Sequence, residues 1–146
     1  MKIKYTVLLL GLAFGAIASP AFALTAEEQA NKAIVLAQMQ AMAQRDVTKA
    51  SSYLADGYIQ HNPLVPTGKA GFVGFFTPRW AGQKPGVFTP PAEVVVEGDL
   101  VMVMQKRVTP DPTAAGSTYD AYWFDLYRVD DGKIVEHWDG ATKRAK

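Results

Sequence analysis

The 146-residue sequence has no cysteine, which excludes disulfide bonds, thiol catalysis and a lipid-bearing cysteine. An excess of charge is also missing, because 15 Lys and Arg residues face 14 Asp and Glu residues, a net charge of +1. Nucleic-acid binding needs a basic surplus that displaces counterions from phosphates, so we expect no nucleic-acid partner. Histidine is limited to His61 and His137. With Asp139 they would suit a metal by ligand type, but no close ligand spacing supports such a site, so we expect no metal and no other cofactor.

Long apolar runs are confined to the N-terminus. Lys2 and Lys4 precede an uninterrupted apolar or glycine run over residues 7–17, followed by Pro20 and the sequence Ala21-Phe22-Ala23. This pattern predicts a secretory signal peptide over residues 1–23. The run is too short to cross about 30 Å of hydrocarbon, which takes roughly 20 helical residues. We therefore expect a periplasmic or secreted protein with no membrane partner after cleavage.

Residues 24–146 are predicted to form one α+β domain. The whole chain is 49% hydrophobic and 20% charged, which is typical of globular proteins. A Thr25-x-x-Glu28 capping box predicts a long helix ending near Arg45-Asp46, and shorter helices are expected over 48–54 and 69–77. Helices come first and strands last, which favours N-terminal helices packed in a curved antiparallel sheet. The strands are expected over 58–62, 93–97, 100–108, 119–129 and 133–139, after a Pro/Gly-rich loop over 78–91.

The last predicted hairpin allows two registers. A two-residue turn at Asp131-Gly132 would set Asp125 opposite Trp138, whereas a three-residue turn beginning at Asp130 would set Asp125 opposite His137. We favour the second, with Gly132 at positive φ, because Asp-Asp-Gly suits a type I turn closed by a left-handed glycine. One sheet face then carries Trp123, Asp125, Tyr127, Val135, His137 and Asp139.

The opposite face of this hairpin is strongly apolar. It would carry Tyr122, Phe124, Leu126, Ile134, Glu136 and Trp138. Contiguous exposed apolar surface usually marks an interface. We therefore expect a homodimer formed through this outer sheet face.

Two segments carry a resemblance to a known family. They are Tyr58-Ile59-Gln60-His61-Asn62-Pro63, followed by Gly68, and the ending from Asp125 through Arg128 to Gly132-Lys133-Ile134-Val135-Glu136-His137-Trp138-Asp139. The sequence resembles the SnoaL-like polyketide cyclases and, more closely, the SnoaL-like aldol-condensation proteins of the nuclear transport factor 2-like superfamily. This resemblance covers about residues 25 to 140. It implies a cone-shaped α+β fold with a pocket between the curved sheet and the helices.

The resemblance also implies site residues. Asp125 is similar in position to a proton-donating aspartic acid of ketosteroid isomerases, and Asp139 to a catalytic aspartate of limonene epoxide hydrolases. Asn62 falls where those isomerases hold their base and those hydrolases hold a water-positioning asparagine, and His137 matches the histidine of the SnoaL-like ending. An amide replaces the isomerase base, and Arg107-Val108-Thr109 lacks the acid of the hydrolase Arg-x-Asp pair. We therefore expect neither of those two reactions.

The leading hypothesis is a cofactor-independent lyase, isomerase or cyclase that removes a proton next to a carbonyl of a small hydrophobic molecule. His137 would be the base, oriented by Asp139, with a protonated Asp125 as donor to the enolate oxygen. The residues expected to bind substrate are His61, Asn62, Gln60, Trp123 and Tyr53. The alternative is a non-catalytic periplasmic small-molecule-binding or accessory domain.

Each polar residue also has a structural interpretation. Asp125 could pair with Arg128 or Lys133 at a rim, since buried carboxylates without partners are costly. His137 could be a hydrogen-bonded core histidine. His61 could be structural, with its ring bonded to a loop carbonyl.

Overall fold

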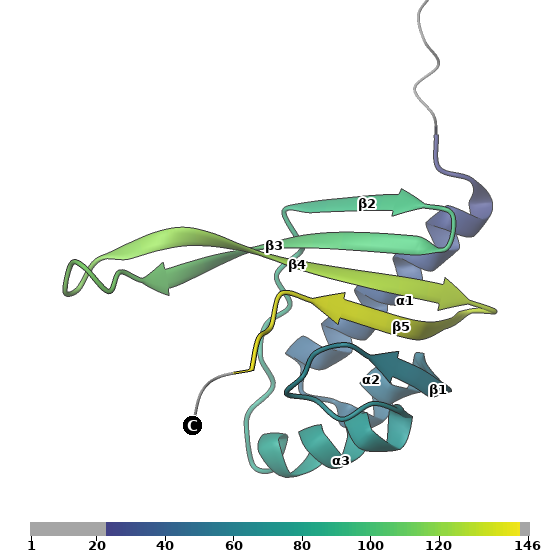
Figure 1. Ribbon diagram of the computed structural model, residues 1–146, viewed down its shortest axis with the longest axis horizontal. Helices are drawn as coiled ribbons and strands as arrows, with labels where there is room; N and C mark the ends of the chain where they lie inside the picture. Colours follow the sequence, from purple (N-terminus) through teal and green to yellow (C-terminus); the bar gives the residue numbers. More distant parts are fainter. Residues whose placement is uncertain (1–22, 144–146) are drawn as a thin grey trace, which may run out of the picture.

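The computed structural model describes residues 23–143, and the predicted signal peptide up to residue 22 lies outside them. Three helices precede most of the sheet: α1 (Ala26–Ala43), α2 (Val47–Ser52) and α3 (Lys69–Trp80). The strands are β1 (Leu54–Gln60), β2 (Glu93–Glu97), β3 (Leu100–Pro110), β4 (Thr118–Asp130) and β5 (Lys133–Asp139), in the sheet order β1-β5-β4-β3-β2. Figure 1 shows α1 running across one face of this sheet, with α2 and α3 beside β1. The predicted α+β fold is confirmed.

The first helix begins where the sequence predicts. The Thr25 hydroxyl accepts a hydrogen bond from the Glu28 N–H at 3.1 Å, and the Glu28 carboxylate accepts one from the Thr25 N–H at 2.8 Å. This reciprocal pair satisfies two of the amide groups that a helix start leaves without partners. The core lies between α1 and the sheet, where the most deeply buried side chains are Val35, Leu54, Val101, Val103 and Ile134.

Strand β1 differs most from the prediction. It begins at Leu54, where a helix was expected to end, because the Leu54 side chain is 2% exposed and its residue pairs with Ile134 of β5. Asp56-Gly57 therefore lies inside a strand with an irregular register instead of ending a helix. β1 pairs with β5 in parallel, with Gln60 opposite His137, whereas the other three strand pairs are antiparallel as predicted.

Helix α3 runs three residues beyond its predicted end, to Trp80, with Pro78 in its last turn. The Arg79 guanidinium donates to the Phe75 carbonyl at 2.7 Å and satisfies a helix-end acceptor. A segment without regular structure, residues 81–92, then leads to β2. It is fixed to the end of α1 by a hydrogen bond from the Gly86 N–H to the Ala43 carbonyl at 2.9 Å.

The three-residue turn predicted for the last hairpin is wrong. Asp131 and Gly132 have φ values of 45° and 70° and form a two-residue turn, with Asp130 opposite Lys133. Two consecutive positive φ values match the twist of a hairpin, and aspartate tolerates the left-handed region well enough to precede glycine. The prediction that Gly132 has positive φ is confirmed.

A bulge then shifts the pairing of β4 with β5. Val129 lies opposite Ile134 but Arg128 lies opposite Glu136, so Val135 is an extra residue on β5. Asp125 consequently lies opposite Asp139 instead of His137. Ile134, predicted on the outer face, is fully buried, because the bulge reverses the side to which the residues before it point.

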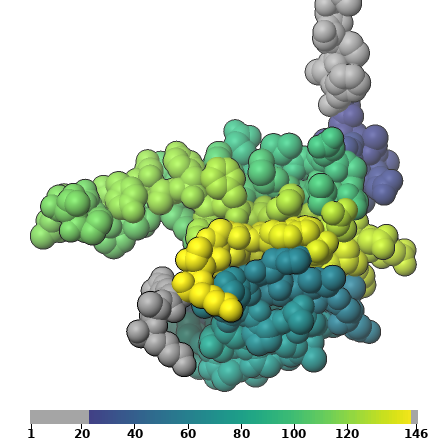
Figure 2. Space-filling view, in the orientation of Figure 1, coloured from purple at the N-terminus to yellow at the C-terminus, as the bar shows by residue number. Residues whose placement is uncertain are grey.

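The far half of the β3–β4 hairpin projects from the body of the molecule (Figures 1 and 2). Tyr119 and Tyr122 on this hairpin are 47% and 51% exposed. Within residues 23–143, no helix combines the length and apolar character needed to span a membrane.

Candidate active site

A cavity of about 590 Å³ lies between the helices and the inner face of the sheet. This volume is in the range that holds a small organic ligand. Its sheet wall is polar, with Tyr58, Gln60, Gln105, Trp123, Asp125, Tyr127, His137 and Asp139. Residues from α1, α3 and the 81–92 segment complete it, chiefly Met39, Met42, Phe72, Phe76 and Phe88. An apolar wall on one side and converging polar groups on the other are typical of a ligand site.

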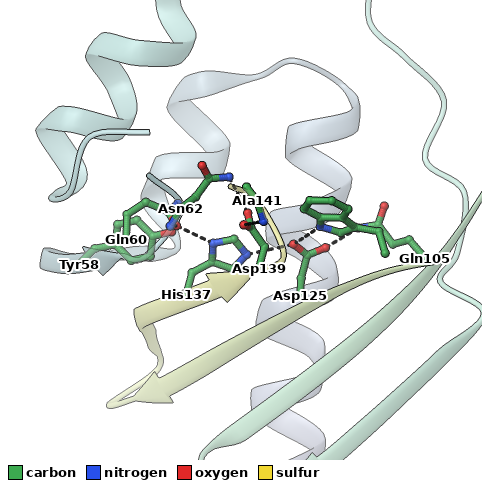
Figure 3. Close-up of polar contacts among 9 residues, drawn as sticks. Tyr58, Gln60, Asn62, Gln105, Asp125, His137, Asp139 and Ala141 are labelled. Carbon is green, nitrogen blue, oxygen red and sulfur yellow. Dashed lines mark hydrogen bonds and ion pairs between the residues drawn. The ribbon is translucent and has the colours of Figure 1, made fainter. Parts of the chain in front are cut away.

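Hydrogen bonds determine that the Nδ1 atom of His137 carries a proton (Figure 3). Its Nδ1 lies 2.9 Å from the Gln60 Oε1, which also accepts from the Asn62 backbone N–H at 2.9 Å. The backbone N–H can only donate, so the Gln60 atom facing it must be the oxygen, and Nδ1 must carry a proton. The Gln60 amide nitrogen donates to the Tyr58 hydroxyl at 2.8 Å.

The other nitrogen of His137 shares a proton with Asp125. Nε2 lies 3.2 Å from the Asp125 Oδ1, and both side chains are buried. A neutral ring with a proton on Nδ1 would present a lone pair there, so one proton must lie between the two atoms. Asp125 also accepts from the Trp123 indole N–H at 3.0 Å and from the Gln105 amide at 3.1 Å. Asp125 therefore makes hydrogen bonds to three neighbouring side chains, which fix the position of its carboxyl group.

Asp139 is the second carboxylate of the site. Its Oδ2 accepts from the Asn62 side-chain amide at 2.7 Å, and its Oδ1 accepts from the Ala141 backbone N–H at 2.8 Å. The Asn62 side-chain oxygen accepts in turn from the Leu64 backbone N–H at 2.8 Å. Asp139 is half-buried and lines the cavity, whereas the oxygens of Asp125 already face three side-chain partners.

Two tyrosine side chains line the same wall. Burial raises the pKa of the Tyr58 hydroxyl, and the negative charges of Asp139 and Asp125 raise it further. Burial also raises the pKa of Tyr127 well above its ordinary value, with Asp125, Tyr58 and Asp139 as weaker causes. Both phenols therefore keep their protons at neutral pH. Because the Tyr58 oxygen accepts from Gln60, its own proton is available to a cavity ligand.

The structure brings together most of the residues predicted for the site. Asp125, His137 and Asp139 share one face and present atoms within 4.8 Å of one another, and Gln60, Asn62 and Trp123 line the same cavity. Within the described chain, His137 makes its two side-chain hydrogen bonds to Gln60 and Asp125, and none to Asp139.

Two predicted substrate-binding residues lie elsewhere. The His61 ring stacks on Trp138 at 4.9 Å and pairs with Glu136 at 2.7 Å, outside the residues that line the cavity. The hydrogen bond from His61 lowers the pKa of Glu136, and the neighbouring Arg128 lowers it further. Tyr53 packs against the core, and its carbonyl accepts from the Ile134 N–H at 2.8 Å.

Sequence reasoning missed three residues of the polar wall: Tyr58 and Tyr127 as donors, and Gln105 as a partner of Asp125. Strand alternation gives a signal for Tyr58, because residues 58, 60 and 62 point one way and residues 59 and 61 the other. The same alternation places His61 outside. Gln105 has no local signal, since only the pairing of β3 with β4 brings it beside Trp123.

Asp125, His137 and Asp139 are also the residues that could ligate a cation by type and distance. Both carboxylate oxygens of Asp125 and both of Asp139 already accept a hydrogen bond from the protein. These donors would have to be displaced or share the oxygens with an ion. The arrangement therefore suits proton transfer between the groups at least as well as metal ligation.

Comparison with known proteins identifies the family. The family model of the SnoaL-like domain matches residues 35–137. No curated protein gives a significant sequence match. Similar solved structures include a candidate SnoaL-like polyketide cyclase from Jannaschia sp. CCS1, with a TM-score of 0.59 and 20% identity over 82% of this chain and 91% of that one.

Two further structures share the fold. An LEH-like epoxide hydrolase from M. tuberculosis has a TM-score of 0.59 and 18% identity, over 77% of this chain and 83% of its own. TerC, co-crystallised with polyporic acid, has a TM-score of 0.56 and 20% identity, over 77% of this chain and 92% of its own. At these identities the likeness establishes the fold, while the chemistry must be argued from the site.

Proposed function

We propose that this chain, which belongs to the SnoaL-like domain family, is a cofactor-independent lyase, isomerase or cyclase acting next to a carbonyl group. The observation that carries the proposal is the cluster of Asp125, His137 and Asp139, with ligand atoms within 4.8 Å of one another on the wall of a 590 Å³ cavity. Such a cluster can accept, hold and return a proton. The apolar side chains that α1 and α3 contribute to the cavity suit a small substrate with a hydrophobic body.

Asp139 takes the role of base in this proposal. Both nitrogens of His137 are engaged by Gln60 and Asp125, so the imidazole has no free lone pair to present to a substrate. Asp139 is half-buried, faces the cavity and is held in position by Asn62. The C–H bond next to the carbonyl breaks, its proton goes to the Asp139 carboxylate, and its electron pair forms an enolate.

The phenols supply donors for the enolate oxygen. Tyr58 and Tyr127 line the cavity, and the raised pKa of each keeps its proton in place. Hydrogen bonds preorganised toward developing negative charge are among the largest contributions to enzymatic rate. The proton shared by Asp125 and His137 leaves that pair without net charge, which limits the repulsion between Asp125 and the Asp139 carboxylate.

The family relatives support a small organic substrate without naming it. TerC was co-crystallised with polyporic acid, and the candidate from Jannaschia is described as a polyketide cyclase. For this chain we retain the broad class, a small carbonyl compound with an apolar body. The non-catalytic binding domain remains the competing function, since a cavity can hold a ligand without turnover.

The test follows deuterium exchange on a compound retained by the protein. The protein is incubated with a metabolite extract of its host, the retained molecule is identified by native mass spectrometry, and exchange at the carbon next to its carbonyl is followed by NMR in D₂O. Replacing Asp139→Asn should reduce the exchange rate by about 10² to 10⁴ and leave binding nearly unchanged, because proton acceptance is lost while shape is kept.

Asp130→Asn is the matched control, because Asp130 is an exposed aspartate at the β4–β5 turn, outside the cavity. It should exchange at the unmodified rate. Retention of a carbonyl compound without any exchange would reject catalysis in favour of the binding domain. Full exchange in Asp139→Asn would reject Asp139 as the base.

A further inference from the structure

One amide interrupts the apolar helix wall of the cavity. The side chains that α1 and α3 contribute to this wall are Met39, Met42, Ala43, Phe72 and Phe76, together with Gln38. Gln38 is therefore the single polar side chain that these two helices contribute to the cavity lining. Its position on α1 follows from the helical repeat, which places residue 38 on the same face as Val35 and Met42.

Gln38 is buried without a hydrogen-bond partner for its carbonyl oxygen. The residue is 5% exposed, and its Oε1 is the single buried side-chain polar atom of residues 23–143 that lacks a partner. Asn31, the other buried amide of α1, donates to the Gly98 carbonyl at 3.1 Å. Buried polar groups are normally paired, so an exception on a cavity wall indicates a partner that the protein itself does not supply.

We propose that Gln38 is a specificity-determining residue that accepts a hydrogen bond from a hydroxyl or N–H group of the cavity ligand. No hydrogen bond to the described chain holds its amide, so a rotation about the last side-chain bond, which exchanges the positions of the buried oxygen and the nitrogen, breaks none. The inference deepens the proposed function: the substrate carries its carbonyl against the sheet wall and a donor group against the helix wall. Hydroxylated cyclic or aromatic ketones have this chemistry, whereas plain hydrocarbon ketones do not.

A structural role for the amide predicts the opposite consequence of its removal. A side chain that stabilised the fold would lose a hydrogen bond on substitution, but Gln38 has none to lose. Replacing it with methionine keeps the length and removes an unpaired buried oxygen, so the free protein should be as stable or more stable. A loss of ligand affinity together with unreduced stability is the signature of a group kept for binding.

The experiment is a binding cycle between one residue and one ligand group. Isothermal titration calorimetry measures Kd for para-hydroxyacetophenone and acetophenone, and for a hydroxylated acetonaphthone and its plain counterpart, with the unmodified protein and Gln38→Met. The unmodified protein should prefer the hydroxylated member of at least one pair by about tenfold, the worth of one hydrogen bond. Gln38→Met should abolish this preference, while its Tm stays unchanged or rises.

Gln40→Met is the control, because Gln40 is an exposed glutamine of the same helix, outside the cavity. It should keep both the preference and the Tm. Equal affinity of the unmodified protein for the two members of each pair overturns the inference. A lower Tm of Gln38→Met, together with an equal loss of affinity for both members, also overturns it. Failure of all four ketones to bind rejects the ligand class. Binding with the expected preference but without exchange would leave Gln38 assigned and reject the catalytic proposal alone.

Discussion

The polar wall of the cavity depends on how single residues share hydrogen bonds. Gln60 can accept from the Nδ1 of His137 only because the Asn62 backbone N–H fixes the orientation of its amide. Because Nδ1 therefore carries a proton, any second proton of the imidazole lies on Nε2, which faces Asp125. The chemistry of the site thus rests on an amide and a backbone group that carry no charge, and the sequence pattern pointed mainly to the charged residues.

The buried phenols give a prediction on stability at alkaline pH. The pKa of Tyr58 is raised in the folded protein, so the unfolded chain releases this proton at lower pH than the folded one. The unfolded state then binds fewer protons above about pH 10, the ordinary tyrosine pKa, and the free energy of unfolding should fall as pH rises. Urea unfolding measures this free energy between about pH 8 and pH 11, a range that brackets the ordinary tyrosine pKa.

Tyr58→Phe should reduce the alkaline fall, because it removes one of the groups that titrate differently in the two states. Tyr119→Phe is the control, since Tyr119 is 47% exposed on the projecting hairpin, and it should leave the fall unchanged. An identical pH dependence in Tyr58→Phe and the unmodified protein would contradict the assignment of a shifted phenol.

At the scale of elements, the last hairpin decides which groups meet. Its two-residue turn alone would pair Asp125 with Trp138, and His137 and Asp139 would then point to the other face of the sheet. The extra residue Val135 restores an alignment in which Asp125 lies opposite Asp139 and diagonal to His137. Bulges beside functional sites often change the direction in which side chains point, and this bulge has that effect.

The turn itself gives a prediction on stability. Gly132 has φ +70°, a region that costs a residue with a Cβ atom roughly 1–2 kcal/mol. Gly132→Ala should lower the free energy of unfolding by about that amount, measured by urea denaturation. Gly57→Ala, inside β1 at a site with no neighbouring atom within 4 Å of an added Cβ and no positive φ, is the matched control. It should be neutral or stabilising, because alanine restricts the unfolded chain; equal losses in both variants would contradict the turn geometry.

At the scale of the molecule, the outer sheet face remains apolar after the bulge is taken into account. Met102, Tyr122 and Phe124 are 37%, 51% and 50% exposed, and Leu126 and Trp138 on the same face are half-buried. Exposed apolar surface of this kind marks interfaces. We retain the proposal of a homodimer through this face, without Ile134, which is buried in the core.

Size-exclusion chromatography with light scattering should give the mass of a dimer at micromolar concentration. Phe124→Glu should shift it to a monomer with an unchanged circular dichroism spectrum, because a charge in an apolar interface is costly. Leu64→Glu, a change of the same kind at a 50% exposed position after β1, should remain dimeric. A monomeric unmodified protein would end the proposal.

Export remains a proposal that rests on residues 1–23. Expressed with its full sequence, the protein should be recovered from the periplasm or medium with Leu24 as its first residue, which intact-mass measurement detects. Ala23→Arg should block processing, because the residue before the cleaved bond must be small. Recovery of the unmodified protein in the cytoplasm with its original N-terminus would contradict export.

The sequence by itself determined those features that depend on local pattern. The capping box marks the start of α1, the ranges of β2 and β5 agree with those predicted, and alternation within β5 places His137 and Asp139 on one face. Each of these follows from a periodicity or a hydrogen bond within a few residues. They were sufficient to predict the α+β fold and most of the polar wall.

The tertiary structure decided the features that depend on distant residues. The parallel docking of β1 on β5 brings Gln60 to His137, and the pairing of β3 with β4 brings Gln105 to Asp125. The local sequence is compatible with more than one register of β4 and β5. The register with a bulge at Val135 is the one that buries Ile134 in the core. Gln38 is left without a partner only because the helix packs it against a cavity, and no local pattern encodes which buried amide lacks one.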